Sequence, residues 1–170
     1  MKTLILARHA KTEQLGYLSS KSDFERQLKP RGFNDTKLVA DYMLEKGITP
    51  DLLITSKAAR AEQTAEVFAQ KLNIAASGIV HEQFIYDGYT SSELISYLGN
   101  YNSEHDSIMI VGHNPEIAMM AINFTDSDYL HFPTTGTIGI SFDVDNWQDI
   151  NAREGKIAWF ISPRIIKDGL

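Results

Sequence analysis

Three short apolar runs constrain the fold of this chain more than any other feature of its sequence. They lie within residues 3–7, 51–55 and 107–111, and a polar side chain follows each of them within two residues. An apolar run without alternation is typical of a central strand in a parallel sheet, because such a strand is buried on both faces. Stretches with helical spacing separate the three runs. We therefore predict parallel strands that are joined by helices.

Capping signals and apolar spacing place the helices. An apolar stripe recurs at i, i+4, i+7 and i+11 across residues 61–72. Thr90 and Glu93 have the spacing of a capping box, and Gly47 stands where a helix would end. Pro30 suits the first turn of a helix. The sequence predicts helices over about 33–46, 58–72, 90–98 and 115–124, an irregular polar loop over 11–26 and a short loop over 86–89.

The remainder of the chain completes the predicted fold. An apolar segment near 79–80 is read as an edge strand, and 137–144 and 157–162 are read as a hairpin-like pair of strands. Strands that alternate with helices imply an α/β fold, a three-layer α/β/α sandwich with a mostly parallel central sheet and helices on both faces. No repeat or linker divides the sequence, so we expect residues 1–170 to form a single domain.

Composition excludes several classes of protein. The chain of 170 residues has no Cys, which excludes disulfides, a thiol nucleophile and thiolate metal ligands. Its net charge of -6 argues against binding nucleic acid, because proteins that neutralise many phosphates are basic. No stretch approaches the ~20 apolar residues of a membrane span, and the first apolar run is too short for a signal peptide. We expect a cytoplasmic protein that binds neither nucleic acid nor membrane.

Polar groups at the ends of the three apolar runs form the candidate site. Arg8 and His9 follow the first run, Ser56 follows the second with Arg60 one turn into the next helix, and His113 follows the third. Parallel strands bring their carboxyl ends to one edge of a sheet, where α/β proteins bind ligands. Two guanidinium groups and two imidazoles, with no obvious acidic neighbour, would repel one another. A bound oxyanion such as phosphate would neutralise them.

Each of these residues also has a plainer interpretation. Arg8 and His9 could be ordinary surface residues at the end of a strand, and Arg60 could be a surface cation. Two histidines at one edge could instead hold a metal ion, but the two arginines would oppose a cation, and no HExxH motif is present. Lys11 and Lys57 are read as solvated charges. Residues 62–63 are read as the solvent face of their helix.

Four motifs, in order along the chain, resemble the histidine phosphatase superfamily, also called phosphoglycerate mutase-like. The motif that begins with Arg8, His9 and Ala10, and the closing segment at 159–163, look most like its SixA branch of phosphohistidine phosphatases. The resemblance covers nearly the whole chain. The four motifs lie at residues 6–11, 28–32, 55–65 and 111–115.

The resemblance implies a covalent mechanism. His9 would be the nucleophile that attacks phosphorus and becomes a phosphohistidine. Arg8, Arg60 and His113 would bind the transferring phosphoryl oxygens, where charge is stabilised in the transition state. Water would then release phosphate. The resemblance implies no cofactor and no metal, because the arginines and backbone amides take the place of one.

The sequence departs from the family pattern at several points. Ala10 stands where many relatives have Gly, and Lys57 replaces a common Pro. The general acid of larger members has no matching motif here. Glu82 and Asp87 lie in the corresponding part of the chain, and Asp87, in a loop before Gly88, is the better candidate, although an Asp before Gly also forms turns. A phosphoramidate needs less acid assistance than an ester, because an imidazole leaving group is readily protonated.

Two classes of function follow. The first is a phosphatase, with phosphohistidine on a protein as the favoured substrate, since the chain lacks a long inserted cap domain and an open pocket could accept a side chain from another protein. A phosphomonoesterase acting on a small phosphorylated metabolite is the alternative within this class. The second is a non-catalytic module that binds a phosphorylated ligand. The intact set of Arg8, His9, Arg60 and His113 favours catalysis.

Overall fold

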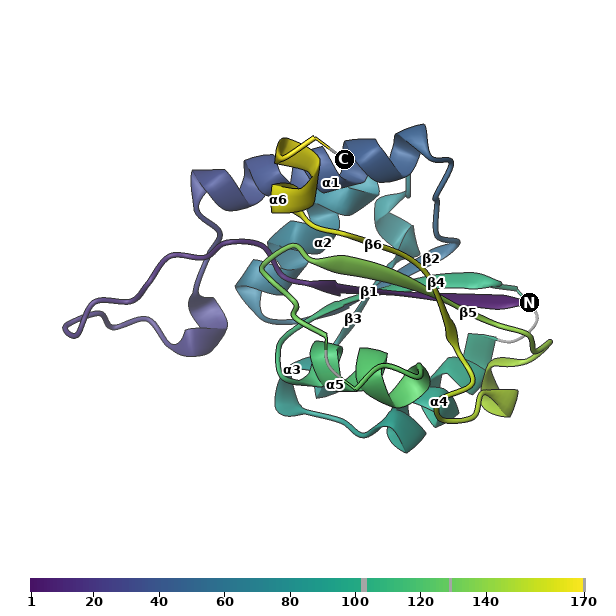
Figure 1. The fold of residues 1–170 in the computed structure, drawn as a ribbon. Coiled ribbons are helices and arrows are strands. Elements are labelled where there is room, and N and C mark those ends of the chain that lie inside the picture. The colour runs from purple at the N-terminus through teal and green to yellow at the C-terminus, as the bar shows by residue number, and fades with distance from the viewer. Residues whose placement is uncertain (102–103, 129, 170) are drawn as a thin grey trace.

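A six-stranded sheet forms the middle layer of the computed structural model, which describes residues 1–101, 104–128 and 130–169 (Figure 1). The order of the strands across the sheet is β3-β2-β4-β1-β5-β6. The first strand in sequence thus lies inside the sheet, between β4 and β5. The strands span Lys2–Arg8 (β1), Leu52–Ser56 (β2), Ile79–Glu82 (β3), Ser107–Gly112 (β4), Thr137–Phe142 (β5) and Lys156–Ile161 (β6).

The pairing of the strands confirms a mostly parallel sheet. Strands β3, β2, β4 and β1 pair in parallel, whereas β5 pairs antiparallel with β1, and β6 pairs antiparallel with β5. Arg8 is level with Gly112, and Thr55 is level with Val111. The carboxyl ends of β1, β2 and β4 therefore meet at one edge of the sheet. The predicted edge strand at 79–80 and the hairpin-like pair at the end of the chain are both present.

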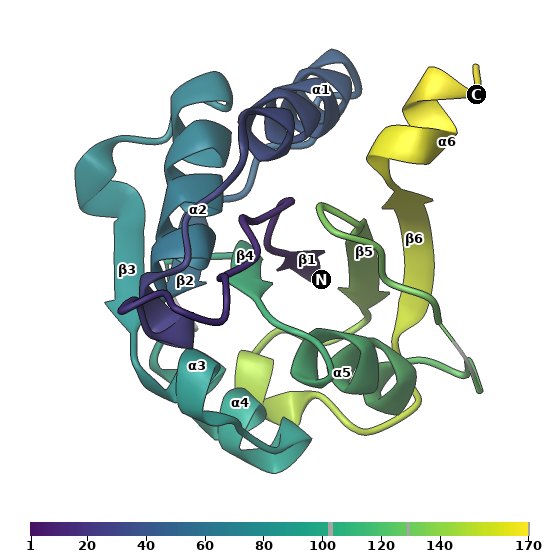
Figure 2. The same cartoon turned by 90° about the vertical axis from the view of Figure 1, so that its left-hand side faces the viewer.

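Helices cover both faces of the sheet, as predicted for a three-layer sandwich. Helices α1, α2 and α6 lie over one face, and α3, α4 and α5 lie over the other (Figures 1 and 2). None of the helices in the described ranges has the length and hydropathy of a membrane span. The helices span Pro30–Glu45 (α1), Ala59–Lys71 (α2), Phe84–Asp87 (α3), Ser91–Leu98 (α4), Glu116–Phe124 (α5) and Pro163–Lys167 (α6).

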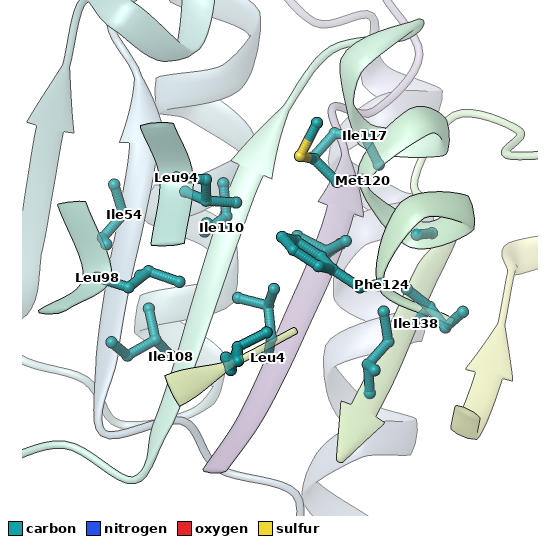
Figure 3. Close-up of a cluster of buried hydrophobic side chains, with 14 of the residues drawn as sticks. Leu4, Ile54, Leu94, Leu98, Ile108, Ile110, Ile117, Met120, Phe124 and Ile138 are labelled. Carbon is teal, nitrogen blue, oxygen red and sulfur yellow. The ribbon is translucent and has the colours of Figure 1, made fainter. Parts of the chain in front are cut away.

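The sheet separates two apolar clusters, which explains why the central strands have no polar alternation. Along β1, Leu4 and Leu6 join the cluster beneath α4 and α5, which is drawn in Figure 3. Ile5 and Ala7 point to the other face and pack with residues of α1 and α2. All four side chains are fully buried. Successive side chains of a strand leave on opposite faces, so a strand that is covered on both sides must be apolar throughout.

Local sequence signals set several helix ends as predicted. The hydroxyl of Thr90 accepts a hydrogen bond from the backbone N–H of Glu93, and the carboxylate of Glu93 accepts one from the backbone N–H of Thr90. Gly47 follows α1 with a φ of 69°, a left-handed conformation that glycine adopts without a steric penalty. The predicted stripe on α2, from Ala61 to Leu72, is buried.

Two segments differ from the prediction. Residues 86–89, expected as a loop, begin inside α3, because Phe84–Asp87 forms one helical turn before Gly88. Four residues are too few to show helical periodicity in the sequence. Helix α6 was not predicted, although Ser162 caps it by accepting from the backbone N–H of Ile165, and Pro163 opens it.

A close contact between the last two strands generates a test of the fold. Gly139 lies in β5 opposite Trp159 of β6, and a Cβ atom at residue 139 would overlap the indole ring. We expect Gly139→Ala to lower the free energy of unfolding by ~1–3 kcal/mol, the usual cost of overpacking. In a Trp159→Ala background the same change should cost little, because the ring is gone. Urea unfolding of the four proteins measures this coupling, and equal costs in both backgrounds would contradict the packing.

Candidate active site

The four candidate residues lie together at the carboxyl edge of the parallel strands. Arg8 ends β1, His9 follows it, Arg60 is the second residue of α2, and His113 follows β4 directly. They share the lining of one cavity of about 270 Å³. The complete lining consists of Arg8, His9, Lys11, Thr12, Gln14, Arg26, Arg60, His113, Asn114 and Thr134.

The two histidine rings are buried next to each other. His9 and His113 are each 7% exposed, and their ring centroids lie 5.3 Å apart. Arg60 is 6% exposed, so it turns inward from the first turn of α2 between its small neighbours. Segments that are distant in sequence thus place two imidazoles and the guanidinium groups of Arg8 and Arg60 around one cavity, and Arg26 of the long loop adds a third guanidinium to the lining.

Burial and local hydrogen bonding hold His9 neutral. Its Nδ1 lies 2.9 Å from the carbonyl oxygen of Ala10, so Nδ1 carries the proton, and Nε2 is left with its lone pair. Desolvation, opposed by the Ala10 hydrogen bond and assisted by the charges of His113, Arg60 and Arg8, lowers the pKa of His9 to about 3. The ring is therefore an unprotonated nitrogen base at neutral pH.

His113 is neutral for similar reasons. Burial, followed by the charge of Arg60, lowers the pKa of His113 to about 4. Its Nε2 lies 2.8 Å from the Oγ of Ser56, and its Nδ1 is buried without a hydrogen-bond partner. If the Ser56 hydroxyl donates to Nε2, the ring proton remains on Nδ1, where it can be given to a ligand.

Both arginines also have a buried Nε that makes no hydrogen bond. Arg8 donates from Nη1 to the carbonyl oxygen of Phe132 at 3.0 Å, and its Nε is buried without a partner. Arg60 has an unpartnered buried Nε as well. A buried polar group without a partner is costly and rare in folded proteins. Three such nitrogens, from Arg8, Arg60 and His113, belong to residues that line one cavity.

One expectation about the charge of the site is wrong. We expected no acidic residue beside the cations, but Asp23 accepts hydrogen bonds from Arg60 through its backbone carbonyl at 2.8 Å and its carboxylate at 3.0 Å. Partial desolvation opposes ionisation of Asp23, but the hydrogen bond from Arg26, the charge of Arg60 and the hydroxyl of Tyr86 lower its pKa overall. Asp23 stands in a polar stretch without periodicity, so no sequence pattern linked it to Arg60.

An aromatic pair next to the cavity was also missed. Tyr86, on α3, packs edge-on against His113 with centroids 5.6 Å apart, and Phe24 packs edge-on against Tyr86 at 4.9 Å. The Arg60 guanidinium carbon lies 6.0 Å from the centre of the Tyr86 ring. The sequence was read as a loop at 86–89, and a loop tyrosine gives no sign of its tertiary neighbours.

The remaining candidates lie outside the cavity lining. Glu82 accepts a hydrogen bond from the hydroxyl of Tyr97 at 2.9 Å, and the exposed Asp87 accepts one from the side chain of Gln83 at 3.1 Å. Neither carboxylate is among the residues that line the cavity. Gln63 was expected on a solvent face, but its side-chain oxygen accepts from the backbone N–H of Leu28 at 2.8 Å and ties the long loop to α2.

Two lysines, Lys11 and Lys57, add positive charge near the site. Lys11, expected to be a solvated charge, lines the cavity. Lys57 lines a neighbouring groove together with Phe24 and Glu62. Among residues 1–101, 104–128 and 130–169, no group of three or more His, Asp or Glu side chains is arranged to hold a metal ion.

Comparisons with known proteins identify chains of similar sequence and fold. Residues 4–84 match the model of the histidine phosphatase superfamily (branch 1). The uncharacterized protein Rv1276c of Mycobacterium tuberculosis is 25% identical over 175 residues, covering 92% of this chain and 99% of that protein. The resemblance to the histidine phosphatases that the motifs indicated is confirmed.

Solved structures with the same fold include two named SixA. The protein histidine phosphatase SixA complexed with tungstate has a TM-score of 0.81 at 20% identity, over 96% of this chain and 99% of that chain. The putative phosphohistidine phosphatase SixA from Agrobacterium tumefaciens has a TM-score of 0.77 at 26% identity, over 95% of this chain and 98% of that chain. The family match and these structures together support a phosphatase.

The electrostatics of His9 and His113 predict how stability depends on pH. A histidine in an unfolded chain has a pKa of about 6.5, above the values of about 3 and about 4 in the fold. The unfolded chain therefore binds more protons between these limits, and the free energy of unfolding falls as the pH drops below 6.5.

We expect His9→Asn to remove part of this dependence. Between pH 7 and pH 5 the wild type should lose on the order of 1–2 kcal/mol more than the variant, because only the wild type has this ring to protonate on unfolding. Urea unfolding at the two pH values measures the difference. Identical losses in the two proteins would contradict a buried, neutral His9.

Proposed function

We propose that this protein is a phosphatase that transfers the phosphoryl group of its substrate to His9 and then to water. The observation that carries the proposal is the set of three buried, unpartnered nitrogens, on Arg8, Arg60 and His113, in residues that share a cavity with His9. They supply donors for the oxygens of a transferring phosphoryl group. The neutral ring of His9 supplies the lone pair.

The reaction has two displacement steps. In the first, Nε2 of His9 forms a bond to phosphorus while the bond from phosphorus to the leaving group breaks, and the leaving group takes the bonding electrons and a proton. In the second, water attacks phosphorus, the bond to Nε2 breaks, and His9 regains its lone pair as inorganic phosphate forms. Arg8, Arg60 and His113 stabilise the charge on the phosphoryl oxygens in both steps. The guanidinium groups of Arg8 and Arg60 supply the positive charge that stabilises the phosphoryl oxygens, and we propose that the mechanism needs no metal ion.

The favoured substrate is phosphohistidine presented by another protein. Among the residues that the structure describes, no Asp or Glu lines the cavity, and Glu82 and Asp87 are held by other partners outside it. An alcohol leaving group needs a proton donor, whereas the free ring nitrogen of a phosphohistidine accepts its proton from solvent. A site without a carboxylic acid in its lining therefore favours a phosphoramidate over a phosphate ester.

Trapping of the intermediate tests the proposed role of His9. Wild-type protein mixed with a labelled phosphodonor and quenched should carry acid-labile, base-stable label. His9→Ala should carry none, whereas His131→Ala, which changes an exposed histidine outside the cavity lining, should be labelled like the wild type. Label retained by His9→Ala would contradict the nucleophile. Phosphate binding without turnover would indicate a non-catalytic module.

A substrate panel tests the proposed leaving group. We expect kcat/KM for a phosphohistidine peptide to exceed that for a sugar phosphate by ~100-fold, within the range that general acid catalysis contributes to ester hydrolysis. Steady-state phosphate release measures each value under the same conditions. A small ester that is hydrolysed faster than the phosphohistidine peptide would reassign the enzyme to phosphorylated metabolites.

A further inference from the structure

The loop between β1 and α1 contacts Arg60, a residue of the cavity lining, through Asp23. This loop, residues 11–29, projects beyond the carboxyl end of β1 (Figure 1) and carries a short 3-10 helix, η1 (Asp23–Glu25), beside α3 (Figure 2). Asp23 accepts from Nη1 of Arg60 with its backbone carbonyl at 2.8 Å and from Nη2 with its carboxylate at 3.0 Å. Both terminal nitrogens of the guanidinium are therefore held by one residue, and the unpartnered Nε is left over.

Asp23 is itself fixed by groups on both sides. Its carboxylate accepts from Nη1 of Arg26 at 3.0 Å and from the hydroxyl of Tyr86 at 3.1 Å. Arg26 also donates from Nε to the backbone carbonyl of Glu13 at 3.2 Å. The carboxylate thus connects α2, α3 and the loop at a single point.

Hydrogen bonds also fix the two ends of the loop over residues 11–29. The backbone N–H of Glu13 donates to the carbonyl of Gln27 at 2.9 Å, and the N–H of Lys29 donates to the carbonyl of Lys11 at 2.9 Å. Leu28 is bonded to the side chain of Gln63 on α2. These bonds fix the chain on either side of Asp23, so its position does not depend on one contact.

An arginine side chain needs such support to act as a precise donor. Four rotatable bonds separate its guanidinium from the backbone, and the planar fork keeps a fixed relation among its donors once two of them are held. Arg8, a half-buried guanidinium of the same cavity, repels Arg60. Without an acceptor, this repulsion would favour rotamers that carry Arg60 away from the cavity. Small displacements of a group that binds the reacting atoms are costly to catalysis.

We propose that Asp23 is the positioning residue of Arg60, which holds the guanidinium so that its Nε–H and remaining donors serve the phosphoryl group. This proposal rests on the proposed function, in which Arg60 binds phosphoryl oxygens. Asp23 does not supply the missing proton, because it already accepts from Arg60, Arg26 and Tyr86. In the alternative role, the Asp23 carboxylate competes with phosphate for Arg60. Removing the charge of Asp23 would then strengthen the binding of phosphate, whereas loss of a positioning residue would weaken it.

The test is a double-mutant cycle between Asp23 and Arg60. We expect Asp23→Asn to lower kcat/KM for a phosphohistidine peptide by ~10- to 100-fold and to weaken the binding of inorganic phosphate, measured by calorimetry. In an Arg60→Gln background, Asp23→Asn should change neither quantity further, because it acts through Arg60. Asp23→Glu, which keeps the charge, should recover part of the loss. The melting temperatures of all variants are compared with that of the wild type.

Asp126→Asn is the matched control. The carboxylate of Asp126 accepts from Nη2 of Arg153 at 2.9 Å, and neither residue lines the cavity, so this change should leave both quantities as in the wild type. Tighter phosphate binding by Asp23→Asn would overturn positioning in favour of competition. Equal losses in the wild-type and Arg60→Gln backgrounds would show that Asp23 does not act through Arg60. Phosphate binding can be measured without turnover, so the cycle gives its result even if the proposed reaction fails.

Discussion

Two positive guanidinium groups at one edge of the sheet, the buried Arg60 and the half-buried Arg8, are the constraint on which the rest of this site depends. Arg60 is 6% exposed, and Arg8 keeps a buried Nε without a partner. Like charges in a poorly solvated cavity repel, and the structure relieves this in three ways. Asp23 pairs with Arg60, the carbonyl of Phe132 accepts from Arg8, and both neighbouring histidines stay neutral. Buried nitrogens of Arg8, Arg60 and His113 still have no partner, and we propose that they bind an oxyanion.

The sheet makes this concentration of donors possible. A parallel register places the ends of β1 and β4 level, so Arg8 lies beside Gly112 and His113 follows within one residue. Both faces of these strands are covered by helices, which keeps water away from the strand ends and makes each polar group there dependent on its protein neighbours. The same burial that lowers the pKa of His9 to about 3 leaves its free nitrogen unprotonated. Burial of the strand ends by the helices thus accounts both for the unpartnered polar groups of the site and for the neutral state of His9.

The sequence predicts the parts of the site that strands position, and not those that loops supply. Arg8, His9 and His113 follow unbroken apolar runs, and the parallel arrangement of such strands brings their ends together. Asp23 and Tyr86 contact Arg60 from a short 3-10 helix in an irregular loop and from a helix of four residues. No periodicity records their partners, because tertiary contacts alone decide them. The expectation of a site without a carboxylate was wrong for this reason, and helix α6 was missed because it is equally short.

The central claim is that the buried donors of the cavity bind one tetrahedral oxyanion. Titration calorimetry with orthovanadate, which has the charge and size of phosphate, measures this directly on the folded protein. The account predicts one bound anion per chain, and at least ~10-fold weaker binding in Arg8→Gln, which removes one charge-assisted donor. Absence of binding, or the same affinity in Arg8→Gln as in the wild type, would contradict it.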